Sequence, residues 1–519
     1  MAPATAPQAG VIDFLSNPDN HKGATTIQRI DTHAAIIFLA GPYAIKIKRA
    51  VKYPFLDFST LEKRHQACVH EIEVNQANAP QIYISTVAIT RQPDNKLQID
   101  GTGKVIEWAV LMHRFDENQT LEKIVEIAPL SDSLSNSLAR EMALIHERAP
   151  RRPATPWIKN LRQYLNHNTN DMARYSKVFP IRQANRLTTE SIANFQQIKH
   201  LLEQRAKAGH VRLCHGDAHL GNIVLLDGKP VFFDAIEFSD DIATSDVLYD
   251  LAFLLMDLWH RRQHRTANKV FNRYLIESQD NRNADNDHYS GLAALPLFMM
   301  MRAMIRARVT AARCAFVPEQ QHAGLIAQAK EYFSTARHCL KNTPPRLIAI
   351  GGLSGTGKST IAASIAADIG RSPGAVIIRS DIIRKKLFNT KETDHLPQSA
   401  YTSQTHQLVY EQLNTLAARI LQTGQSVIID AVFARQNERD AISNTSQTAG
   451  VPFSGIWLSA PEHILISRVS SRRNDASDAD ETIVKKQLTY DHGPISWIKI
   501  DASGKPDDIT ESVITRLKL

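Results

Sequence analysis

Cysteine is scarce in this sequence, and long apolar runs and a leader-like start are missing. The chain of 519 residues holds four scattered cysteines, and no two of them form a C-x-x-C pair. This argues against a disulfide framework and against metal ligation by cysteine, and it predicts a reducing, cytoplasmic setting. The most apolar stretch, 292–301, is short and broken by Pro296, so we expect a buried helix and no membrane association. The first eight residues lack a basic start followed by an apolar core, so we expect no signal peptide.

The composition is that of an ordinary soluble protein. Hydrophobic residues make up 43% of the chain and charged residues 22%, which excludes a disordered chain. The net charge of +8 fits a protein that handles phosphates, a nucleic-acid binder, or simply a basic solvated surface. Composition therefore leaves the function to the motifs.

A proline-containing linker divides the chain. Pro344 and Pro345, in the segment 341–345, remove two backbone donors and disfavour helix, so we place a domain boundary near residue 343. The predicted domains are 1–342, with a small lobe at about 1–118 and a large helical lobe at about 119–342, and 343–519.

The two predicted domains differ in their pattern of elements. Before the boundary we expect the strands 34–39, 43–47 and 105–112, the helix 61–75, and a mainly helical region from about 120 to 340 with a strand-rich patch at 211–233. After the boundary, apolar strands alternate with helical stretches, which predicts a parallel sheet with helices on both faces. The predicted strands there are 347–350, 375–378, 426–429, 454–458 and 497–500.

A complete phosphate-binding loop follows the first strand of the second domain. Residues 352–359 match G-x-x-x-x-G-K-[ST] at every position, and 360–369 read as a helix. In this context backbone N–H groups and the helix N-terminus surround the phosphates of ATP, Lys358 reaches the β- and γ-phosphates, and Ser359 holds Mg²⁺. The predicted ATP-binding residues are Gly352, Ser354, Gly355, Thr356, Gly357, Lys358, Ser359 and Thr360. The similar segment 101–104, Gly-Thr-Gly-Lys, precedes a strand, and we interpret it as a hairpin turn.

Polar residues at the ends of neighbouring strands extend this predicted site. Asp430 follows the strand 426–429, where its carboxylate can orient the Mg²⁺ shell. Asp381 follows the strand 375–378, where it can accept the proton of an acceptor hydroxyl or serve as a helix N-cap, and both interpretations stay open. Arg384 lies one helical turn later. Arg468, Arg472 and Arg473 read as a basic helix face; the hypothesis is a mobile lid in which Arg472 clamps the phosphate, and the alternative is a solvated charged face.

A second set of phosphotransfer residues lies in the first domain. Asp217 and Asn222 stand at D-x-x-x-x-N spacing, and the apolar run 231–233 leads to Asp234. One carboxylate that accepts a hydroxyl proton, with an Asn and a second Asp that hold Mg²⁺, is the set that phosphotransferases need. Upstream, Lys46 on a strand can pair with phosphates, and Glu71 on the following helix can anchor it.

Two features leave alternatives open in this set. Lys48 shares the strand face of Lys46 and can replace it. No G-x-G-x-x-G lies between the first two strands, where the turn is Gly41-Pro42, so cover for the phosphates has to come from elsewhere. We interpret His215 and His219 as residues that shape the loop by hydrogen bonds rather than as metal ligands.

These motifs resemble two known families. Through H-G-D-x-H-x-x-N at 215–222 and the continuation 234–237, residues 1–340 resemble the aminoglycoside phosphotransferase family, a relative of the protein-kinase fold. That resemblance implies Asp217 as catalytic base, Asn222 and Asp234 as Mg²⁺ ligands, and an ion pair between Lys46 and Glu71. Residues 346–519 resemble P-loop kinases of the zeta-toxin and polynucleotide-kinase-like group. Together they imply an α+β, two-lobed kinase-like domain followed by an α/β P-loop domain, an arrangement that resembles bacterial tandem proteins.

Three functions fit these motifs. The first is an ATP- and Mg²⁺-dependent phosphotransferase with two candidate active sites, which moves the γ-phosphoryl group to a hydroxyl of a sugar, an aminoglycoside-like compound or a nucleotide-sugar. The second is a nucleic-acid 5′-end kinase or repair protein, favoured by the positive charge but lacking an RNA-binding signature. The third is a non-enzymatic, ATP-gated regulatory protein with a degenerate kinase-like domain. The acceptor, the choice between ATP and GTP, and the oligomeric state stay open.

Overall fold

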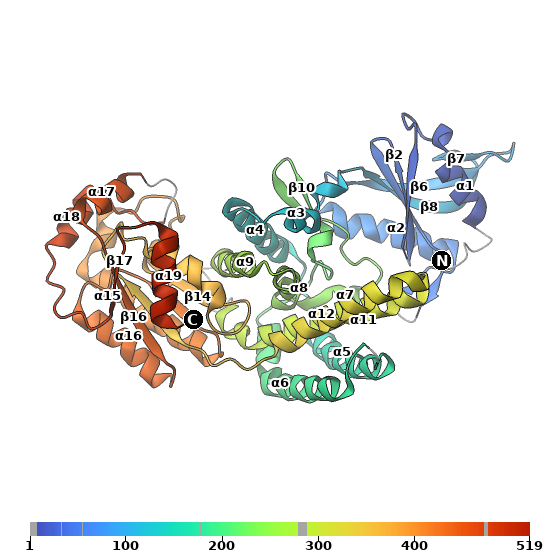
Figure 1. Cartoon of the computed structure of the whole chain (residues 1–519). Helices are drawn as coiled ribbons and strands as arrows, with labels where there is room; N and C mark the ends of the chain where they lie inside the picture. Colours follow the sequence, from blue (N-terminus) through green and yellow to red (C-terminus); the bar gives the residue numbers. More distant parts are fainter. Residues whose placement is uncertain are drawn as a thin grey trace. The chain divides into compact units, whose positions relative to one another are not determined.

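A six-stranded antiparallel sheet lies near the N-terminus in the computed structural model (Figure 1). The structure describes residues 8–32, 34–53, 56–176, 178–278, 288–471 and 476–518. The strand order is β1-β2-β3-β8-β6-β7. The bounds are β1 Ile27–Asp31, β2 Ala35–Ala40, β3 Tyr43–Lys48, β6 Tyr83–Arg91, β7 Leu97–Ile99 and β8 Lys104–His113; the short β4 (Lys52–Tyr53) and β5 (Leu56–Asp57) pair separately.

Side-chain alternation along β3 builds a different layer on each face of this sheet. Ile45 and Ile47 pack in one cluster with residues of α1 (Ala9–Ser16). Ala44 packs on the opposite face with Cys68 of α2 (Leu61–Gln76). Because successive strand residues point to opposite faces, Lys46 and Lys48 lie on the face that α2 covers. The sheet therefore delivers two lysines to one helix.

The hairpin-turn interpretation of segment 101–104 was wrong. β6 pairs with β7 along one edge and with β8 along the other, so this segment carries the chain across β6. A Cβ atom at Gly103 would lie 2.1 Å from the carbonyl oxygen of Arg91, so only glycine lets the crossing chain approach the strand this closely. The glycines serve a close backbone approach and not a tight turn.

Helices make up most of the rest of the first compact unit, which comprises the described parts of 1–195, 202–261 and 301–334. Two antiparallel strand pairs lie among them, β9 (Val211–Leu213) with β12 (Thr244–Asp246) and β10 (Ile223–Leu226) with β11 (Lys229–Phe232). The helices are α3 Leu121–Ile127, α4 Asp132–Arg148, α5 Ala154–Arg174, α6 Ile181–Lys207, α7 Asp240–Ala243, α8 Val247–His260, α11 Leu295–Ala312 and α12 His322–Cys339. Parts of α6, α11 and α12 belong to the second unit.

The apolar stretch 292–301 is helical and buried. It forms a short 3-10 turn and the first residues of α11. Pro296 is the second residue of α11, where a missing N–H breaks no helical hydrogen bond. In the part of the chain that the structure describes, no helix is both long and apolar enough to cross a bilayer.

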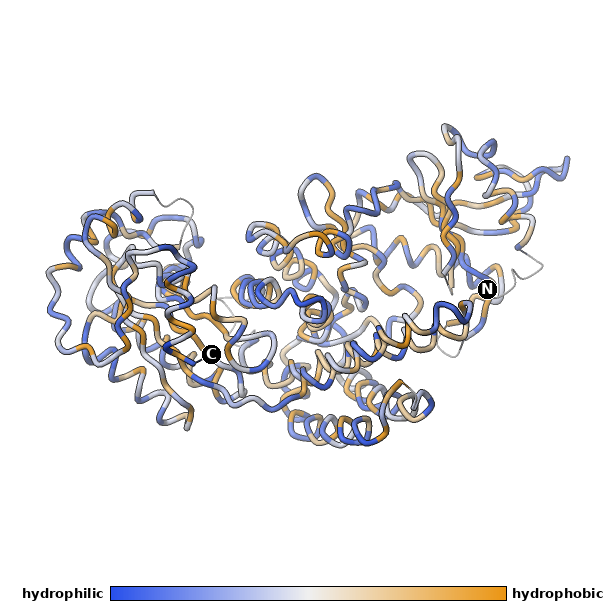
Figure 2. Tube along the Cα trace, in the orientation of Figure 1, coloured by the Kyte–Doolittle hydropathy of each residue, from blue (hydrophilic) through white to orange (hydrophobic). Residues whose placement is uncertain are grey.

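A five-stranded parallel sheet forms the core of the second unit, as the sequence predicts. The strand order is β14-β15-β13-β16-β17, and hydrophobic strands run through the centre of the unit (Figure 2). Apolar residues of α13 and α19 pack on the sheet residues Ile348, Ile428 and Ile456, while α15 and α16 contact the sheet as well. The bounds are β13 Leu347–Gly351, α13 Lys358–Ile365, β14 Val376–Arg379, α14 Ser380–Leu387, α15 Ser403–Gln422, β15 Val427–Asp430, α16 Gln436–Thr448, β16 Phe453–Ser459, α17 Glu462–Ser470, α18 Glu481–Leu488, β17 Ile498–Asp501 and α19 Pro506–Leu517.

Residues 262–300 pack in this second unit although they precede the proline linker. Helix α9 (His264–Glu277) lies along the edge strand β14. Asn272 Oδ1 accepts a hydrogen bond from the Ile377 N–H (2.7 Å), and its Nδ2 donates to the Ala375 carbonyl (3.1 Å). Asn268 Nδ2 donates to the same carbonyl at 3.0 Å. Side chains from an earlier segment thus form hydrogen bonds with backbone groups at an edge strand. The domain boundary near residue 343 stays a prediction.

Candidate active sites

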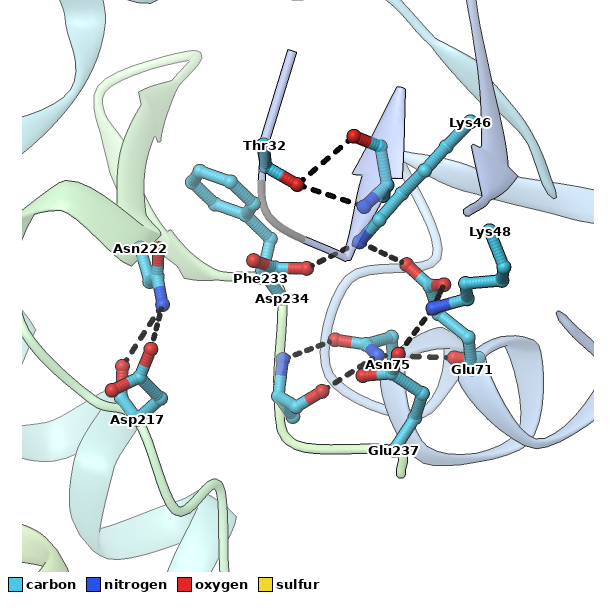
Figure 3. A network of polar contacts seen from close by, with 12 residues as sticks. Thr32, Lys46, Lys48, Glu71, Asn75, Asp217, Asn222, Phe233, Asp234 and Glu237 are labelled. Atoms are coloured by element: carbon cyan, nitrogen blue, oxygen red, sulfur yellow. Dashed lines mark hydrogen bonds and ion pairs between the residues drawn. The ribbon is translucent and has the colours of Figure 1, made fainter. Parts of the chain in front are cut away.

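A chain of ion pairs links β3, α2 and the segment after β11 in the first unit (Figure 3). Lys46 Nζ lies 2.7 Å from Glu71 Oε1 and 2.7 Å from Asp234 Oδ1. The sequence predicts the pair with Glu71, and the structure brings all three residues together. Burial lowers the pKa of Lys46, but the carboxylates of Asp234 and Glu71 outweigh it and raise that pKa well above its usual value. Lys46 is therefore an ammonium ion at neutral pH.

Glu71 is fully buried and nevertheless charged. Burial raises the pKa of its carboxyl group, but the ammonium groups of Lys46 and Lys48 reduce it to about 2. Both lysines lie on the α2 face of β3. The sequence left open whether Lys46 or Lys48 pairs with Glu71, and in the structure both do. Lys48 pairs with the second oxygen of Glu71 at 2.6 Å and with Glu237.

The segment 215–222 forms a loop around Asp217. Asn222 Nδ2 donates to Asp217 Oδ2 at 3.0 Å, and His219 Nε2 lies 3.5 Å from the same oxygen. Burial raises the pKa of Asp217, but the charge and hydrogen bond of His219, with smaller effects of Arg306 and His215, lower it overall. The carboxylate is thus ionised and able to accept a proton from a hydroxyl group held beside it.

Both loop histidines form hydrogen bonds that shape the loop, and His215 Nδ1 accepts one from the Asp217 N–H at 3.3 Å. His215 Nε2 lies 3.0 Å from the Phe233 carbonyl, and His219 Nδ1 accepts from the Gly221 N–H at 3.1 Å. The latter bond leaves Nε2 of a neutral His219 as the donor toward Asp217. The two imidazoles hold the loop closed on itself, as the sequence predicts.

The β10–β11 hairpin places Asn222 and Asp234 at one end. Ile223 pairs with Phe232, and beyond this pair the Phe233 N–H donates to the Asn222 carbonyl at 3.0 Å. Asp234 follows with φ +58°, a conformation rare outside glycine, and its N–H donates to the Tyr83 hydroxyl. Since Asn222 uses its Nδ2 toward Asp217, its amide oxygen and the Asp234 carboxylate are the donors that fit Mg²⁺, which prefers oxygen ligands.

Two acidic residues of α8 support the loop, and sequence reasoning missed them. Asp250 accepts hydrogen bonds from the N–H groups of His215 (3.1 Å) and Gly216 (2.9 Å). Asp257 accepts from the Leu220 N–H at 3.0 Å. The two carboxylates lie seven residues apart in an otherwise apolar helix, which puts them on one helix face. That spacing was the signal available in the sequence.

The phosphate-binding loop of the second unit connects β13 to α13, as predicted. Gly352, Gly355 and Gly357 have φ values of 137°, 89° and 87°, which residues with a side chain rarely adopt. At Gly355 a Cβ atom would lie 2.6 Å from the Leu465 carbonyl oxygen. The Thr356 hydroxyl donates to the Leu353 carbonyl (2.8 Å), and the Ser354 N–H donates to Gln487 Oε1 (2.8 Å).

Polar side chains of this loop contact a carbonyl of the loop and the end of β15. Lys358, the first residue of α13, donates from Nζ to the Gly352 carbonyl at 2.9 Å. The hydroxyl of Ser359 donates to Asp430 Oδ2 at 2.6 Å, and Arg379 Nε lies 3.2 Å from the same oxygen. Thr360 follows in the first turn of the helix and is exposed. A hydroxyl and a carboxylate in contact form an oxygen donor set that fits Mg²⁺.

Asp381 lies in the first turn of α14, and the N-cap interpretation was wrong. The helix begins at Ser380, so its N-cap is Arg379 and Asp381 is its second residue. Burial and the charge of Asp430 raise the pKa of Asp381 against the opposing charges of Arg379 and Lys358. A carboxyl group with a raised pKa, close enough to Lys358 to feel its charge, has a property that general bases share.

Arg384 and Arg468, the predicted arginines among the described residues, contact backbone carbonyls. Arg384 is buried, donates to the Ala400 carbonyl at 2.9 Å, and has its guanidinium 5.1 Å from the ring centre of Tyr401. Arg468 donates to the carbonyls of Ala502 (2.7 Å) and Gly504 (3.0 Å). Arg472 and Arg473 lie outside the described residues. The lid hypothesis therefore stays a prediction.

Family models match two separate stretches of the chain. The model described as a phosphotransferase enzyme family matches residues 87–286, and the model described as an AAA domain matches residues 347–491. An uncharacterized protein of Mycobacterium tuberculosis is 27% identical over 493 residues, which cover 91% of this chain and 92% of that protein.

Solved structures of two kinases are similar to parts of this chain. A choline/ethanolamine kinase family protein from Mesorhizobium loti is 14% identical, with a TM-score of 0.34, over 62% of this chain and 94% of that one. A sugar kinase from Janibacter sp. is 22% identical, with a TM-score of 0.27, over 34% of this chain and 95% of that one. With TM-scores this low, neither likeness carries an argument about activity.

The two family matches confirm the resemblance and the fold class that the sequence predicts. The first match includes Asp217 and Asp234 but begins after Lys46, and its last residues, 262–286, belong to the second unit; the second match includes the phosphate-binding loop. Two stretches in tandem are therefore similar to two families: residues 87–286 to a phosphotransferase enzyme family of kinase-like fold, and residues 347–491 to P-loop kinase-like domains.

Proposed function

We propose that this protein is an ATP- and Mg²⁺-dependent phosphotransferase with two active sites, which transfers the γ-phosphoryl group to a hydroxyl of a small molecule. The observation that carries the proposal is that each unit gathers a lysine, a candidate base and oxygen donors for Mg²⁺. In the first unit these are Lys46, Asp217, and the pair Asn222 and Asp234. In the second they are Lys358, Asp381, and the contact of Ser359 with Asp430.

In the first unit, Asp217 accepts the proton of the acceptor hydroxyl. Its low pKa means that it is ionised whenever the acceptor arrives, and Asn222 and His219 orient its carboxylate. Lys46 contacts the phosphates and Glu71 fixes its position. Mg²⁺ held by Asn222 and Asp234 would neutralise phosphate charge.

In the second unit, the loop amides and Lys358 bind the phosphates of ATP, and Asp381 is the base. The hydroxyl of Ser359 and the carboxylate of Asp430 would hold Mg²⁺. Arg379, which contacts Asp430, adds a positive charge where negative charge gathers during transfer. Sequence reasoning did not single out Arg379, because its role depends on Asp430 lying on the neighbouring strand.

The test is a screen for transfer of labelled γ-phosphate to sugars, aminoglycosides, nucleotide-sugars, nucleosides and RNA ends. We expect Asp217→Asn to abolish one activity and Lys358→Ala the other, each by at least about 100-fold. Matched controls are Asp227→Asn, an exposed carboxylate in the β10–β11 turn, and the exposed Lys499→Ala. Full activity of both mutants on every acceptor would contradict the proposal, and transfer to RNA ends alone would favour the nucleic-acid kinase.

A further inference from the structure

A cavity of about 700 Å³ lies in the second unit, beside the edge strand β14. Its walls are residues of β14, α14, α15, α9 and the short helix α10 (His288–Gly291), which all belong to this unit. Leu387 and Leu408 line it with exposed side chains, so the cavity is open to solvent. Sites for small molecules in proteins measure about 300–1,000 Å³, so this cavity has the size of a ligand site.

Helix α14 separates this cavity from the proposed catalytic groups. Ile383 and Lys386 line the cavity, whereas Asp381 and Arg384 do not. Successive residues of a helix are rotated by about 100°, so these two pairs project from opposite sides of α14. Arg384 donates to the Ala400 carbonyl on its own side. The cavity is therefore separate from the place where Asp381 would meet an acceptor hydroxyl.

The cavity lining combines apolar side chains with positive charges. The buried Ile383 and further aliphatic residues of β14, α14 and α15 form its apolar part. Arg379, Lys386 and Arg419 bring three positive charges to the lining, and Glu411 brings one negative charge. A net positive charge among apolar walls suits a ligand that is anionic at one end and apolar over the rest.

Lys386 has surroundings that an anion would improve. Burial lowers the pKa of its amino group to about 8, although the nearby carboxylates of Glu277 and Glu392 act in the opposite direction. The charge of Arg273 on α9 lowers that pKa further. The ammonium form is therefore disfavoured here, and an anion beside it would stabilise this form and raise the pKa.

We propose that this cavity is a second ligand site of the unit, which takes a small molecule with an apolar body and one carboxylate or phosphate group. The anionic group lies beside Lys386 and the apolar body against Ile383. The inference goes beyond the proposed function and does not depend on it, because ligand binding is measured directly.

Arg379 connects this site to the proposed Mg²⁺ donors. It lines the cavity, and its Nε lies 3.2 Å from Asp430 Oδ2. The same carboxylate oxygen accepts the hydrogen bond of the Ser359 hydroxyl. An anion in the cavity therefore shares Arg379 with Asp430. Removal of the Asp430 charge should make Arg379 more available to the ligand.

Four probes with the same ring and different charges test the site. Benzoate and phenyl phosphate carry the two anionic groups, benzyl alcohol is neutral, and benzylamine is cationic. Saturation-transfer NMR titrations of the full chain measure each affinity with saturating Mg·ADP present, which keeps the nucleotide phosphate sites occupied. We expect the better anion to bind at least about tenfold more tightly than benzyl alcohol and benzylamine, and that anion identifies the group. Equal affinities, tightest binding of benzylamine, or no binding by any probe would overturn the proposal.

Two variants test whether the anion binds in this cavity. Lys386→Met should weaken binding about tenfold, while Lys386→Arg should keep the affinity within about threefold. Thr415→Trp puts a large ring at an exposed position of the lining and should abolish binding without removing a charge. The matched control Lys391→Met changes an exposed lysine after α14 and should have no effect. Thermal unfolding verifies that each variant folds. Unchanged affinity in Lys386→Met and Thr415→Trp would place the anion elsewhere.

The pH dependence of binding tests the role of Lys386. The affinity should fall as the pH rises from 7 to 9, because the free lysine loses its proton near pH 8 and the anion binds the charged form. Lys386→Arg should remove this fall, since a guanidinium stays charged. Asp430→Asn should strengthen binding about threefold by releasing Arg379. If the wild type and Lys386→Arg share one flat profile, Lys386 does not contact the anion and the proposal fails.

Discussion

His219 is the residue through which pH should act on the first site. Burial lowers its pKa, but the charge and hydrogen bond of Asp217 raise it above the ordinary value overall. A group whose pKa is raised on folding contributes stability below its unfolded pKa of about 6.5 and loses it as the pH rises through the folded value. We expect His219→Gln to cost about 2 kcal/mol below pH 6, with a smaller difference at higher pH.

Thermal unfolding of both proteins between pH 5 and pH 9 measures this difference. His167→Gln, which changes an exposed histidine of α5, is the matched control and should show no such trend. A difference in Tm that grows with pH would contradict the assignment of the proton to this pair.

Asp381 is the residue through which pH should act on the second site. Its pKa is raised, and a general base works only when it is deprotonated, so the rate of transfer should increase with pH. We expect Asp381→Asn to reduce transfer by the second unit at least about 100-fold while Mg·ATP affinity is retained. In the wild type, the rate should still rise with pH above the ordinary pKa of an aspartate, about 3.9, because the pKa of Asp381 is raised. Transfer of labelled phosphate in an Asp217→Asn background measures the loss of activity and its pH dependence, and calorimetry measures the Mg·ATP affinity. The exposed Asp394→Asn is the control. Loss of ATP affinity in Asp381→Asn would instead assign this residue to nucleotide binding.

At the scale of elements, helix α9 forms hydrogen bonds with the edge strand β14 of the parallel sheet, although the two are far apart in sequence. Asn272 satisfies the Ile377 N–H and the Ala375 carbonyl, which are otherwise edge groups of β14. Asn272→Leu keeps a similar volume but leaves both groups without this partner, so we expect it to destabilise the second unit by about 1–3 kcal/mol.

Hydrogen exchange of the β14 amides gives the local measurement for this change. Exchange at 376–379 should accelerate in Asn272→Leu, while Asn437→Leu, an exposed position of α16, should leave it unchanged. Equal protection in both variants would show that α9 does not stabilise this edge.

At the scale of the whole molecule, the arrangement of α9 predicts how the chain can be divided. A fragment of residues 343–519 lacks Asn268 and Asn272, so the edge of β14 would be open to pairing with another chain. We expect this fragment to aggregate or to unfold at a lower temperature than a fragment of 262–519. Size-exclusion chromatography and thermal unfolding of the two fragments measure the difference. Equal behaviour would support the boundary near residue 343 that the proline linker predicts.

Local sequence patterns were sufficient to predict the structural features that consecutive residues form by themselves. The five strands of the second sheet lie within one or two residues of their predicted bounds, because each apolar run is short and separated by polar segments. The phosphate-binding loop was readable for the same reason, since eight consecutive residues make the strand–loop–helix turn. The reading of 101–104 failed because glycines look alike in a hairpin turn and in a close crossing over a strand.

By itself the sequence determined the kinds of element and the phosphate-binding loop, and it named the candidate residues of both proposed sites. Only the tertiary structure decided the partners: Glu237 beside Lys48, Asp250 and Asp257 beneath the loop of Asp217, Arg379 on Asp430, and Asn272 on β14. These contacts join residues far apart along the chain, and ion pairs and hydrogen bonds act over a few ångströms. Their distances are set by how helices and strands pack, which one-dimensional periodicity does not contain.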